Sequence, residues 1–412
     1  MAKPKLALIP ATQGSKLYSV LPADGVGDFD FSRGSAATRI NKDGLIETVA
    51  SGVSRLNYPL IDGVVSGCPS HLLEPQRTNL FTYSEDLTKA TWDKESCFIT
   101  PNLIIAPDGT LTADKVTESV VWGAHYYKKI DVSLTNGVKY TASVFLKKGE
   151  RDRTVIRVFD GVNSFSNQIN LNTGIIENGD ANAKIFYNFN GWIGIEVTFI
   201  AAATIVTSFA LRVHLMPFQF GGTQYAGDGV SGFYAWGNQF EIGNRTSYIP
   251  TVASTETRLV ENCNNDFSIL PTIANTTTIV LKFIAKGFEN NFDELLRFSD
   301  GTNQIALEGF SNISFNNNYN IYGDGTGGAG MVTNNLQLTT NSINIISFSY
   351  SGTSLRFSHN GNTIATNAPT GNFPTITKIS HSIGNLSSIE ILELKVYNDF
   401  KTQEDLNSLT TI

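Results

Sequence analysis

The chain has 412 residues, of which 41% are hydrophobic and 11% aromatic, so it is long enough for two or three domains that each bury a core. Only 16% of the residues are charged and the formal net charge is -7. An acidic chain without a basic run has no electrostatic footprint for a phosphate backbone, which argues against nucleic-acid binding. Three scattered cysteines argue against a disulfide framework and a zinc site, and no apolar run is long enough to span a membrane.

Residues 1–75 lack sustained periodicity, because Gly, Pro, Asp and Ser recur every few residues. Such a segment buries little surface alone, so we expect an extended arm that lies along another domain or another subunit. Its first apolar run is too short for a signal peptide, and we expect synthesis in the cytosol. Three arginines, Arg33, Arg39 and Arg55, stand out here. They either bind a ligand or, as we favour, pair with carboxylates and carbonyls that hold the segment extended.

Strand signals follow one another from residue 76 to residue 255. Residues 139–148 alternate, with Tyr140, Ala142, Val144 and Leu146 on one face. Further strands are expected at residues 154–159, 165–171, 192–200, 208–215 and 233–242. In the last of these, one face is expected to carry Tyr234, Trp236, Asn238, Phe240 and Ile242. Short strands at regular spacing predict a sandwich or barrel, and a jelly roll is the most economical choice.

Residues 256–265 are polar and unpatterned and are expected to form a linker to a third domain, residues 266–412. Strands are expected there at residues 278–286, 294–299, 304–308, 343–350, 354–359, 362–365 and 384–398. Asn360-Gly361 is the strongest hairpin signal in the chain, because Asn-Gly fits a type I′ turn. Residues 402–409 predict one short helix with acidic residues in its first turn.

Catalytic motifs are missing from the sequence. The five histidines are dispersed, with no HExxH, and there is no GxSxG elbow, P-loop or GxGxxG after a strand. His214, inside an apolar strand, is expected to be a satisfied core or rim histidine. Glycoside hydrolysis needs two carboxylates on one face, and the spacing of Glu390 and Glu393 predicts opposite faces of a strand. We therefore expect no enzymatic activity, with a polysaccharide-cleaving enzyme as the alternative.

Sugar binding is the more plausible function, because lectin sites combine aromatic rings with amide and carboxylate groups. One candidate site is an aromatic cluster, although half of it is also compatible with a core: Trp122, His125, Tyr126 and Tyr127. The other is a polar loop at residues 315–330, which is equally compatible with a tip that has no function. Its candidate residues are Asn316, Asn318, Tyr319 and Asp324. Trp92, Trp192 and Trp236 are expected in the core.

No cofactor or metal is predicted. Asp108-Gly109 and Asp324-Gly325 are compatible with calcium sites, but isolated Asp-Gly pairs are usually turns.

Several segments contain the sequence motifs of one family. Residues 224–251 read QYAGDGVSGFYAWGNQFEIGNRTSYIPT, residues 28–41 read DFDFSRGSAATRIN, and residues 68–80 read CPSHLLEPQRTNL. These motifs resemble those of bacteriophage tail-fibre and other virion-appendage proteins. Two positions depart from the family pattern: Ser54-Arg55 replaces the usual Pro-Arg, and His71 lies where Ser or Ala is common. The resemblance implies a carbohydrate-binding jelly roll. The final strand and helix resemble the close of concanavalin-A-like, laminin-G-type lectin domains.

Together these observations predict an all-β protein with an extended arm (1–75), a jelly roll (76–255), a linker (256–265) and a concanavalin-A-like domain (266–412). The resemblance implies a non-enzymatic virion protein, made in the bacterial cytoplasm, that binds host surface glycans. Its partners would be capsid, portal or tail proteins, contacted through the arm, and a homotrimer is expected. A polysaccharide-cleaving appendage and a purely architectural decoration protein are the alternatives.

Overall fold

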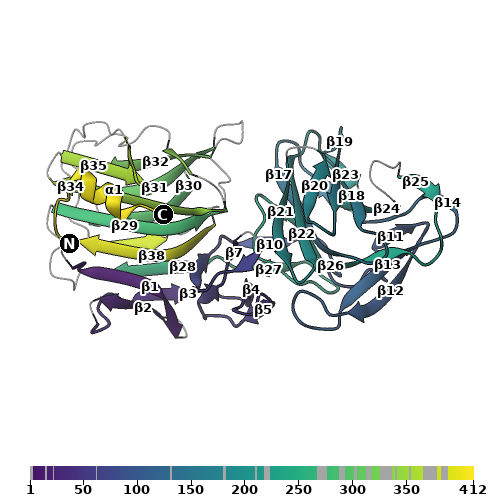
Figure 1. Cartoon of the computed structure of the whole chain (residues 1–412), viewed down its shortest axis with the longest axis horizontal. Helices are drawn as coiled ribbons and strands as arrows, with labels where there is room; N and C mark the ends of the chain where they lie inside the picture. The colour runs from purple at the N-terminus through teal and green to yellow at the C-terminus, as the bar shows by residue number, and fades with distance from the viewer. Residues whose placement is uncertain are drawn as a thin grey trace.

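The computed structural model confirms an all-β protein. It describes residues 3–13, 16–21, 23–61, 63–129, 132–179, 182–208, 211–217, 223–266, 276–286, 293–300, 304–311, 317–324, 336–338, 341–351, 354–364, 378–381 and 388–412. Figure 1 shows two β-rich halves, with both chain termini in the left half and the middle of the chain in the right half. No helix in these described ranges is long and apolar enough to cross a membrane.

The right half is a sandwich of two six-stranded antiparallel sheets, as predicted for the jelly roll. The first sheet, named here the tyrosine sheet, contains in spatial order β11 (Trp92–Glu95), β15 (Tyr126–Lys129), β24 (Leu211–Met216), β18 (Arg153–Phe159), β19 (Ser164–Asn170) and β20 (Ile175–Asn178). The second, named here the tryptophan sheet, contains β12 (Cys97–Ile104), β13 (Ala113–Glu118), β26 (Gly232–Ile242), β17 (Lys139–Lys148), β22 (Trp192–Ile200) and β21 (Ala183–Phe189). The predicted inward face of β17 is confirmed, since all four of its residues join the core between the sheets.

The left half is built on one antiparallel sheet of 16 strands, counted over the described residues. Its main path is β33 (Leu336–Gln337), β32 (Asn317–Asp324), β31 (Gln304–Ser311), β30 (Asp293–Ser299), β37 (Lys378–His381), β28 (Asn262–Asp266), β3 (Phe29–Ser32), β2 (Lys16–Leu21), β1 (Leu6–Gln13), β38 (Ile389–Tyr397), β29 (Thr276–Ala285), β34 (Ile343–Ser351), β35 (Ser354–His359) and β36 (Asn362–Ile364). Two further strands, β6 (Arg55–Asn57) and β9 (Ser70–Leu73), join at β38. Helix α1 (Gln403–Leu409) packs on β34 and β35, with Thr402 as its N-cap.

The N-terminal segment lies along another domain, as expected, but it does so as strands of this sheet rather than as an extended arm. β1 pairs with Leu394–Val396 of β38, and β9 pairs with Ile389–Ile391 of the same strand. Leu6, Leu8 and Leu73 are buried in the same core as residues of β29 and β38. A segment too poor in apolar residues to fold alone is thus stabilised by pairing with strands more than 300 residues away.

The expected linker is also structured. Glu256–Arg258 forms β27, which pairs with β10 (Arg77–Asn79), and Asn262–Asp266 forms β28 between β3 and β37. The chain therefore enters and leaves the jelly roll through two paired strands, and the jelly roll is an insertion in the left half. Four short ladders complete the description: β4 (Ala37–Ile40) with β5 (Ile46–Val49), β7 (Leu60–Ile61) with β8 (Val64–Val65), β14 (Trp122–Ala124) with β25 (Gln224–Ala226), and β16 (Val132–Leu134) with β23 (Ile205–Ser208).

β26 departs from the strict alternation expected of it. Phe233 and Ala235 lie in the core between the two sheets, but so does Phe240, which belongs to the opposite parity. The cause is a bulge, since the register with β17 shifts at Gly237, which has a φ of +63°. Trp236 consequently faces outward into a second core, where residues of the N-terminal segment cover the tryptophan sheet. Trp92, Trp192 and Trp236 are all buried, as predicted.

A buried ionic cluster joins the two halves. Arg55 donates to Glu261 Oε1 and Oε2 at 2.9 and 2.5 Å and lies 2.9 Å from Glu74 Oε2. Arg33 donates to Glu261 at 2.6 Å, and Arg258 donates to Glu74 at 2.6 Å. Burial alone raises the pKa of Glu74, but Arg258 and Arg55 outweigh it and hold that pKa below its ordinary value. The structural interpretation of Arg33 and Arg55 is therefore confirmed.

Candidate functional site

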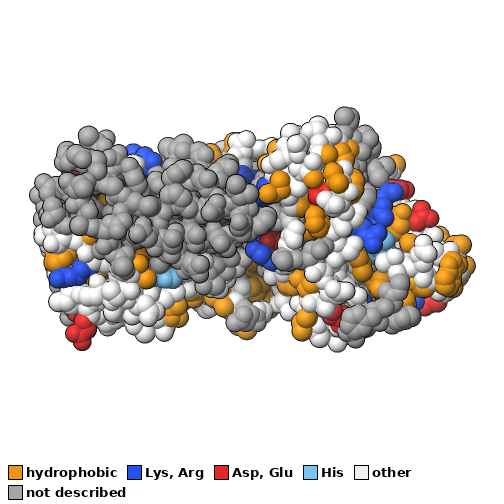
Figure 2. All heavy atoms as spheres, turned by 90° about the horizontal axis from the view of Figure 1, so that it is seen from above, with side chains coloured by type: hydrophobic (Ala, Val, Ile, Leu, Met, Phe, Trp, Pro, Cys, Tyr) orange, Lys and Arg blue, Asp and Glu red, His pale blue; other side chains and the backbone are white. Residues whose placement is uncertain are grey.

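Trp122 lies at the end of the jelly roll farthest from the left half, on the small ladder of β14 and β25 (Figure 1). Its side chain is 73% exposed, and Val120, Val121 and Val230 are also exposed. Figure 2 shows hydrophobic side chains gathered at this end of the molecule. The tip therefore presents a solvent-exposed indole with an apolar surround.

A buried carboxylate, Glu118, anchors the tip. Tyr225 Oη donates to its Oε2 at 2.7 Å, and the Asp228 backbone N–H donates to its Oε1 at 2.9 Å. The guanidinium of Arg151 donates to both oxygens, through Nε at 2.9 Å and through Nη2. Because Glu118 is fully buried and fully engaged, its role is to fix the tip rather than to meet a ligand.

The glycine-rich loop before β26 has an architectural explanation. A Cβ on Gly227 would lie 2.0 Å from the carbonyl oxygen of Ser119, so the close approach of the two chains requires glycine. Asp228 Oδ1 accepts from the backbone N–H groups of Val230 at 2.8 Å and Ser231 at 2.7 Å. The sequence motif of this loop therefore consists, at Gly227 and Asp228, of residues that shape the scaffold of the tip.

The structure separates the predicted aromatic cluster. His125 is fully buried, with backbone carbonyl oxygens 2.6 and 3.2 Å from its two ring nitrogens. Tyr127 is fully buried and donates to Asn238 Oδ1 at 3.1 Å. These two side chains do not reach solvent, so they cannot contact a ligand in this structure. Of the four candidates, only Trp122 and Tyr126 remain accessible.

Tyr126 lies on the outer face of the tyrosine sheet. Leu211, Val213 and Ile156 point into the core, so the residues between them in each strand point outward. The register places Tyr126 opposite His214, His214 opposite Val155, and Val155 opposite Gln168. A second row in the same register contains Lys128, Arg212, Arg157 and Ser166. In Figure 2, Lys and Arg side chains gather over the part of the jelly roll where Figure 1 places β18 and β24.

The half-buried ring of Tyr126 is surrounded by polar groups. The Arg212 guanidinium lies 4.5 Å from the ring centroid and the His214 ring lies 4.9 Å away. Arg157 Nε donates to Ser166 Oγ at 2.9 Å on the same face. An aromatic ring beside guanidinium, hydroxyl and amide groups is the combination that sugars require, because they present both CH patches and hydroxyls.

His214 differs from the expected satisfied histidine. Its side chain is only 1% exposed, yet neither ring nitrogen has a hydrogen-bond partner. Burial, and after it the charges of Arg157 and Arg212, lower the pKa of His214 to about 3. The ring is therefore neutral at ordinary pH and retains one unused donor and one unused acceptor. Such an unpaired polar group is costly unless something else satisfies it.

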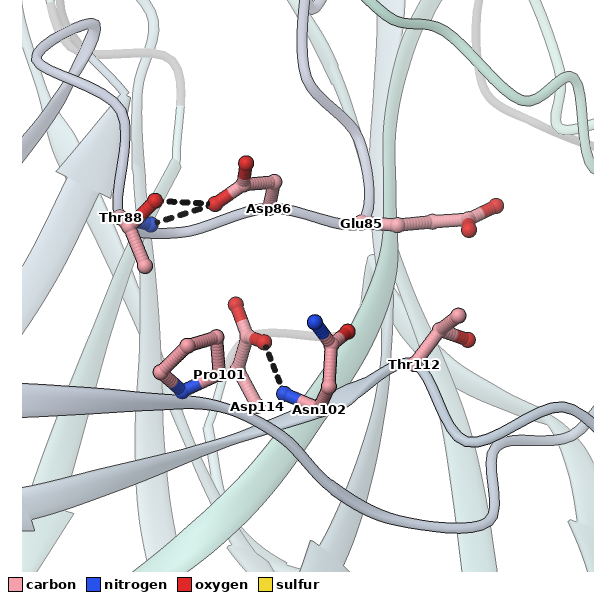
Figure 3. Close-up of a pocket in the computed structure, with 7 residues that line it drawn as sticks. All are labelled: Glu85, Asp86, Thr88, Pro101, Asn102, Thr112 and Asp114. Carbon is pink, nitrogen blue, oxygen red and sulfur yellow. Dashed lines mark hydrogen bonds between the residues drawn. The ribbon is translucent and has the colours of Figure 1, made fainter.

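A pocket of about 340 Å³ opens on another side of the jelly roll (Figure 3). Its lining comprises Glu85, Asp86, Thr88, Pro101, Asn102, Thr112 and Asp114. Burial raises the pKa of Asp114 to about 6, although its oxygens accept backbone N–H bonds from Leu87 at 2.8 Å and Asn102 at 3.1 Å. Figure 3 shows Glu85 directed away from Asp86 and Asp114, and Glu85 accepts from Tyr248 Oη at 2.9 Å. Asp114 on β13 thus connects the loop after β10 to β12, and Glu85 connects that loop to Tyr248, which are structural roles.

The second predicted site lies largely outside the described residues. Asn316 is among the residues that are not described, and the side chains of Asn318, Tyr319 and Asp324 are not described either. The backbone of Asn317–Asp324 is strand β32, paired with β31 along its whole length. The expectation of a long polar loop is therefore wrong for these residues, because pairing with a neighbouring strand outweighs their poor strand propensity.

Glu390 and Glu393 lie on the same face of β38, contrary to the spacing argument. Ile391 and Leu394, also three apart, both point into the core, because a bulge in the register with β29 leaves Leu392 as an extra residue. Glu390 is buried and accepts from Ser70 Oγ at 2.5 Å. It also pairs with Lys286 at 2.6 Å, so it holds neighbouring strands together.

Within the described ranges, no three His, Cys, Asp or Glu side chains are grouped so as to hold a metal ion.

Comparison with known proteins identifies no family. No family model and no curated protein matches the chain. Among solved structures, the chain is similar to the carbohydrate-binding module CBM40 of a Ruminococcus gnavus sialidase, with 14% identity, 33% of this chain, 83% of that chain and a TM-score of 0.25. It is also similar to domains LG4-5 of the mouse laminin alpha1 chain, with 10% identity, 78% of this chain, 88% of that chain and a TM-score of 0.23. A tandem CBM22 domain pair from Paenibacillus barcinonensis gives 8% identity, 78% of this chain, 98% of that chain and a TM-score of 0.24. At this level the likenesses concern the all-β sandwich architecture and nothing finer.

Proposed function

We propose that this chain is a non-enzymatic glycan-binding protein whose binding surface is the outer face of the tyrosine sheet. The observation that carries the proposal is the half-buried ring of Tyr126, which lies among guanidinium, imidazole and hydroxyl groups on that face. A sugar ring stacked on Tyr126 would place its hydroxyls over the two cross-strand rows. Trp122, four residues earlier in the chain, offers a second exposed ring for an extended saccharide.

Binding without cleavage agrees with the carboxylates of this face. Glycoside hydrolysis needs two carboxyl groups directed at one scissile bond. Here Glu177 accepts from Arg153 at 3.0 Å, and Asp93 pairs with Lys128 at 3.0 Å. Each carboxylate is paired with a cation. Asp93 and Glu177 lie on the two opposite edge strands of the sheet, with four strands between them. The proposed function is therefore recognition.

The same proposal assigns the chain to a phage virion, made in the host cytoplasm and exposed to host surface glycans. This assignment is supported by the sequence motifs that resemble those of virion-appendage proteins. These motifs include the tip loop at Gly227-Asp228 and the buried Arg33 and Arg55. Those residues hold the scaffold, so the resemblance supports a common architecture. Contacts with capsid, portal or tail proteins and a homotrimeric assembly belong to the proposal.

The experiment is binding of the purified full chain to a panel of immobilised bacterial surface polysaccharides. Tyr126→Ala is expected to weaken binding at least tenfold, which corresponds to about 1.4 kcal/mol. Tyr18→Ala, on β2 in the other half, is the matched control and should bind like the parent protein. Release of reducing ends would establish the polysaccharide-cleaving alternative. No binding to any polysaccharide of the panel would favour the alternative of a purely architectural decoration protein.

A further inference from the structure

We propose that the outer face of the tyrosine sheet selects acidic saccharides, and that Arg157 holds the carboxylate of the bound sugar. The inference rests on the proposed glycan-binding function and adds the chemical class of the ligand. In the protein alone, neighbouring positive charges on this face repel each other, and the carboxylate of a bound sugar would reduce that repulsion.

Three positively charged side chains lie in one row on this face. Lys128 pairs with Arg212 across one ladder, and Arg212 pairs with Arg157 across the next, so three cations lie side by side on one face. Like charges directly opposite each other in an antiparallel sheet are destabilising. Burial, and after it the charge of Arg212, lower the pKa of Arg157, as expected where two guanidinium groups lie near each other.

Two other cations of this face, Lys128 and Arg153, have carboxylate partners. Lys128 lies 3.0 Å from Asp93, and Arg153 lies 3.0 Å from Glu177 and 2.9 Å from Asp152. Arg157 is different. Its hydrogen bond runs through Nε to Ser166 Oγ, and no carboxylate of the described residues lies within ion-pair distance of its guanidinium. Among the residues that the structure describes, none uses the edge of the Arg157 guanidinium that would form a two-point contact with a carboxylate.

His214 lies beside this row of cations. It occupies the neighbouring row on the same face, between Tyr126 and Val155, with both ring nitrogens buried and unpartnered. A neutral histidine adds no charge of its own, so the positive charge at this place comes from the neighbouring Arg212 and Arg157.

The positive row is local. The whole chain has a formal net charge of -7, so its overall field does not attract polyanions. Preference for an acidic saccharide must then come from short-range contacts at this face. Because the planar guanidinium fork matches a carboxylate, we assign a carboxylate-bearing sugar; sulfated and phosphorylated saccharides are separate arms of the test.

The experiment measures affinity of the full chain for acidic bacterial polysaccharides and for the same polymers after chemical reduction of their carboxyl groups. The parent protein is expected to bind the acidic form at least tenfold more tightly. Arg157→Gln should abolish that preference, measured as the ratio of the affinities for the acidic and the reduced polymer, and Arg157→Lys should restore the ratio only in part. Lys184→Gln, which removes an exposed cation from the tryptophan sheet, is the matched control.

The outcomes separate the two proposals. Equal affinity for acidic and reduced polymers, or an Arg157→Gln variant that keeps the preference, would overturn this inference and leave glycan binding intact. Tighter binding to sulfated or phosphorylated polymers than to carboxylated ones would overturn the assignment of a carboxylate. No binding to any polymer, acidic or neutral, would overturn the proposed function and this inference with it. Circular dichroism of each variant excludes loss of fold as the cause.

Discussion

Glu261 is the residue on which the joint between the two halves depends most. Its side chain is fully buried and accepts four hydrogen bonds. Three come from guanidinium groups, one from Arg33 and two from Arg55, and the fourth from the backbone N–H of Glu74 at 2.9 Å. Glu261→Gln would keep the shape of the side chain and remove its charge.

The expected loss of stability is about 4 kcal/mol. Removing one partner of a buried ion pair costs about 3–5 kcal/mol, because the remaining charge stays buried without compensation. Here the substitution leaves three buried arginines, Arg33, Arg55 and Arg258, and among the described residues Glu74 is then the carboxylate that contacts two of them, Arg55 and Arg258. The surface pair of Arg39 and Glu47, 3.0 Å apart, offers a matched control. Glu47→Gln should cost less than about 1 kcal/mol, since exposed pairs contribute little.

Urea unfolding followed by two probes tests this expectation. Far-UV circular dichroism reports both halves, whereas the four tryptophans all lie in the jelly roll, so their fluorescence reports that half. For Glu261→Gln we expect a large shift of the circular-dichroism midpoint. A loss below about 1 kcal/mol, equal to that of Glu47→Gln, would refute the reasoning that the buried cluster stabilises the joint between the two halves.

Two further predictions concern the left half. Residues 266–412 alone should show no cooperative unfolding, because β38 loses its partners β1 and β9 and the core loses Leu6, Leu8 and Leu73; the same residues joined to residues 1–75 should regain it. A cooperative transition of the isolated piece would show that the N-terminal strands are dispensable. The second prediction concerns His71, whose pKa burial lowers to about 4. Between pH 6.5 and pH 4 the unfolded chain takes up a proton that the folded chain does not, so the free energy of unfolding falls as pH falls, by about 2 kcal/mol from pH 7 to pH 5. His71→Leu should lose this part of the pH dependence, as measured by urea midpoints at the two pH values, and an unchanged drop would contradict the assignment.

Local signals in the sequence predicted local structure well. The alternation of residues 139–148 became β17 with the expected core face. Asn360 and Gly361 have φ angles of 46° and 79°, as a type I′ hairpin requires. Thr402 and Asp405 form a capping box at the predicted helix. In each case the determinant lies within a few residues, so the sequence window contains the whole cause.

Faces of strands were predicted less well. The bulges at Gly237 and Leu392 each insert one residue and exchange the two faces beyond it. β26 and β38 are buried on both sides along much of their length, so apolar and polar positions do not reveal where the alternation breaks. Only the hydrogen-bonded register with the neighbouring strand determines it.

By itself the sequence determined the all-β class and most strand positions, and it favoured a structural role for Arg33 and Arg55 in pairing with carboxylates or carbonyls. The tertiary structure alone decided that the N-terminal strands complete the left half. It also decided that Tyr126, His214, Arg212 and Arg157 meet on one face. The physical reason is the same for both. Pairing between strands distant in the chain is selected by the total burial and hydrogen bonding of the folded sheet, which no local pattern of residues encodes.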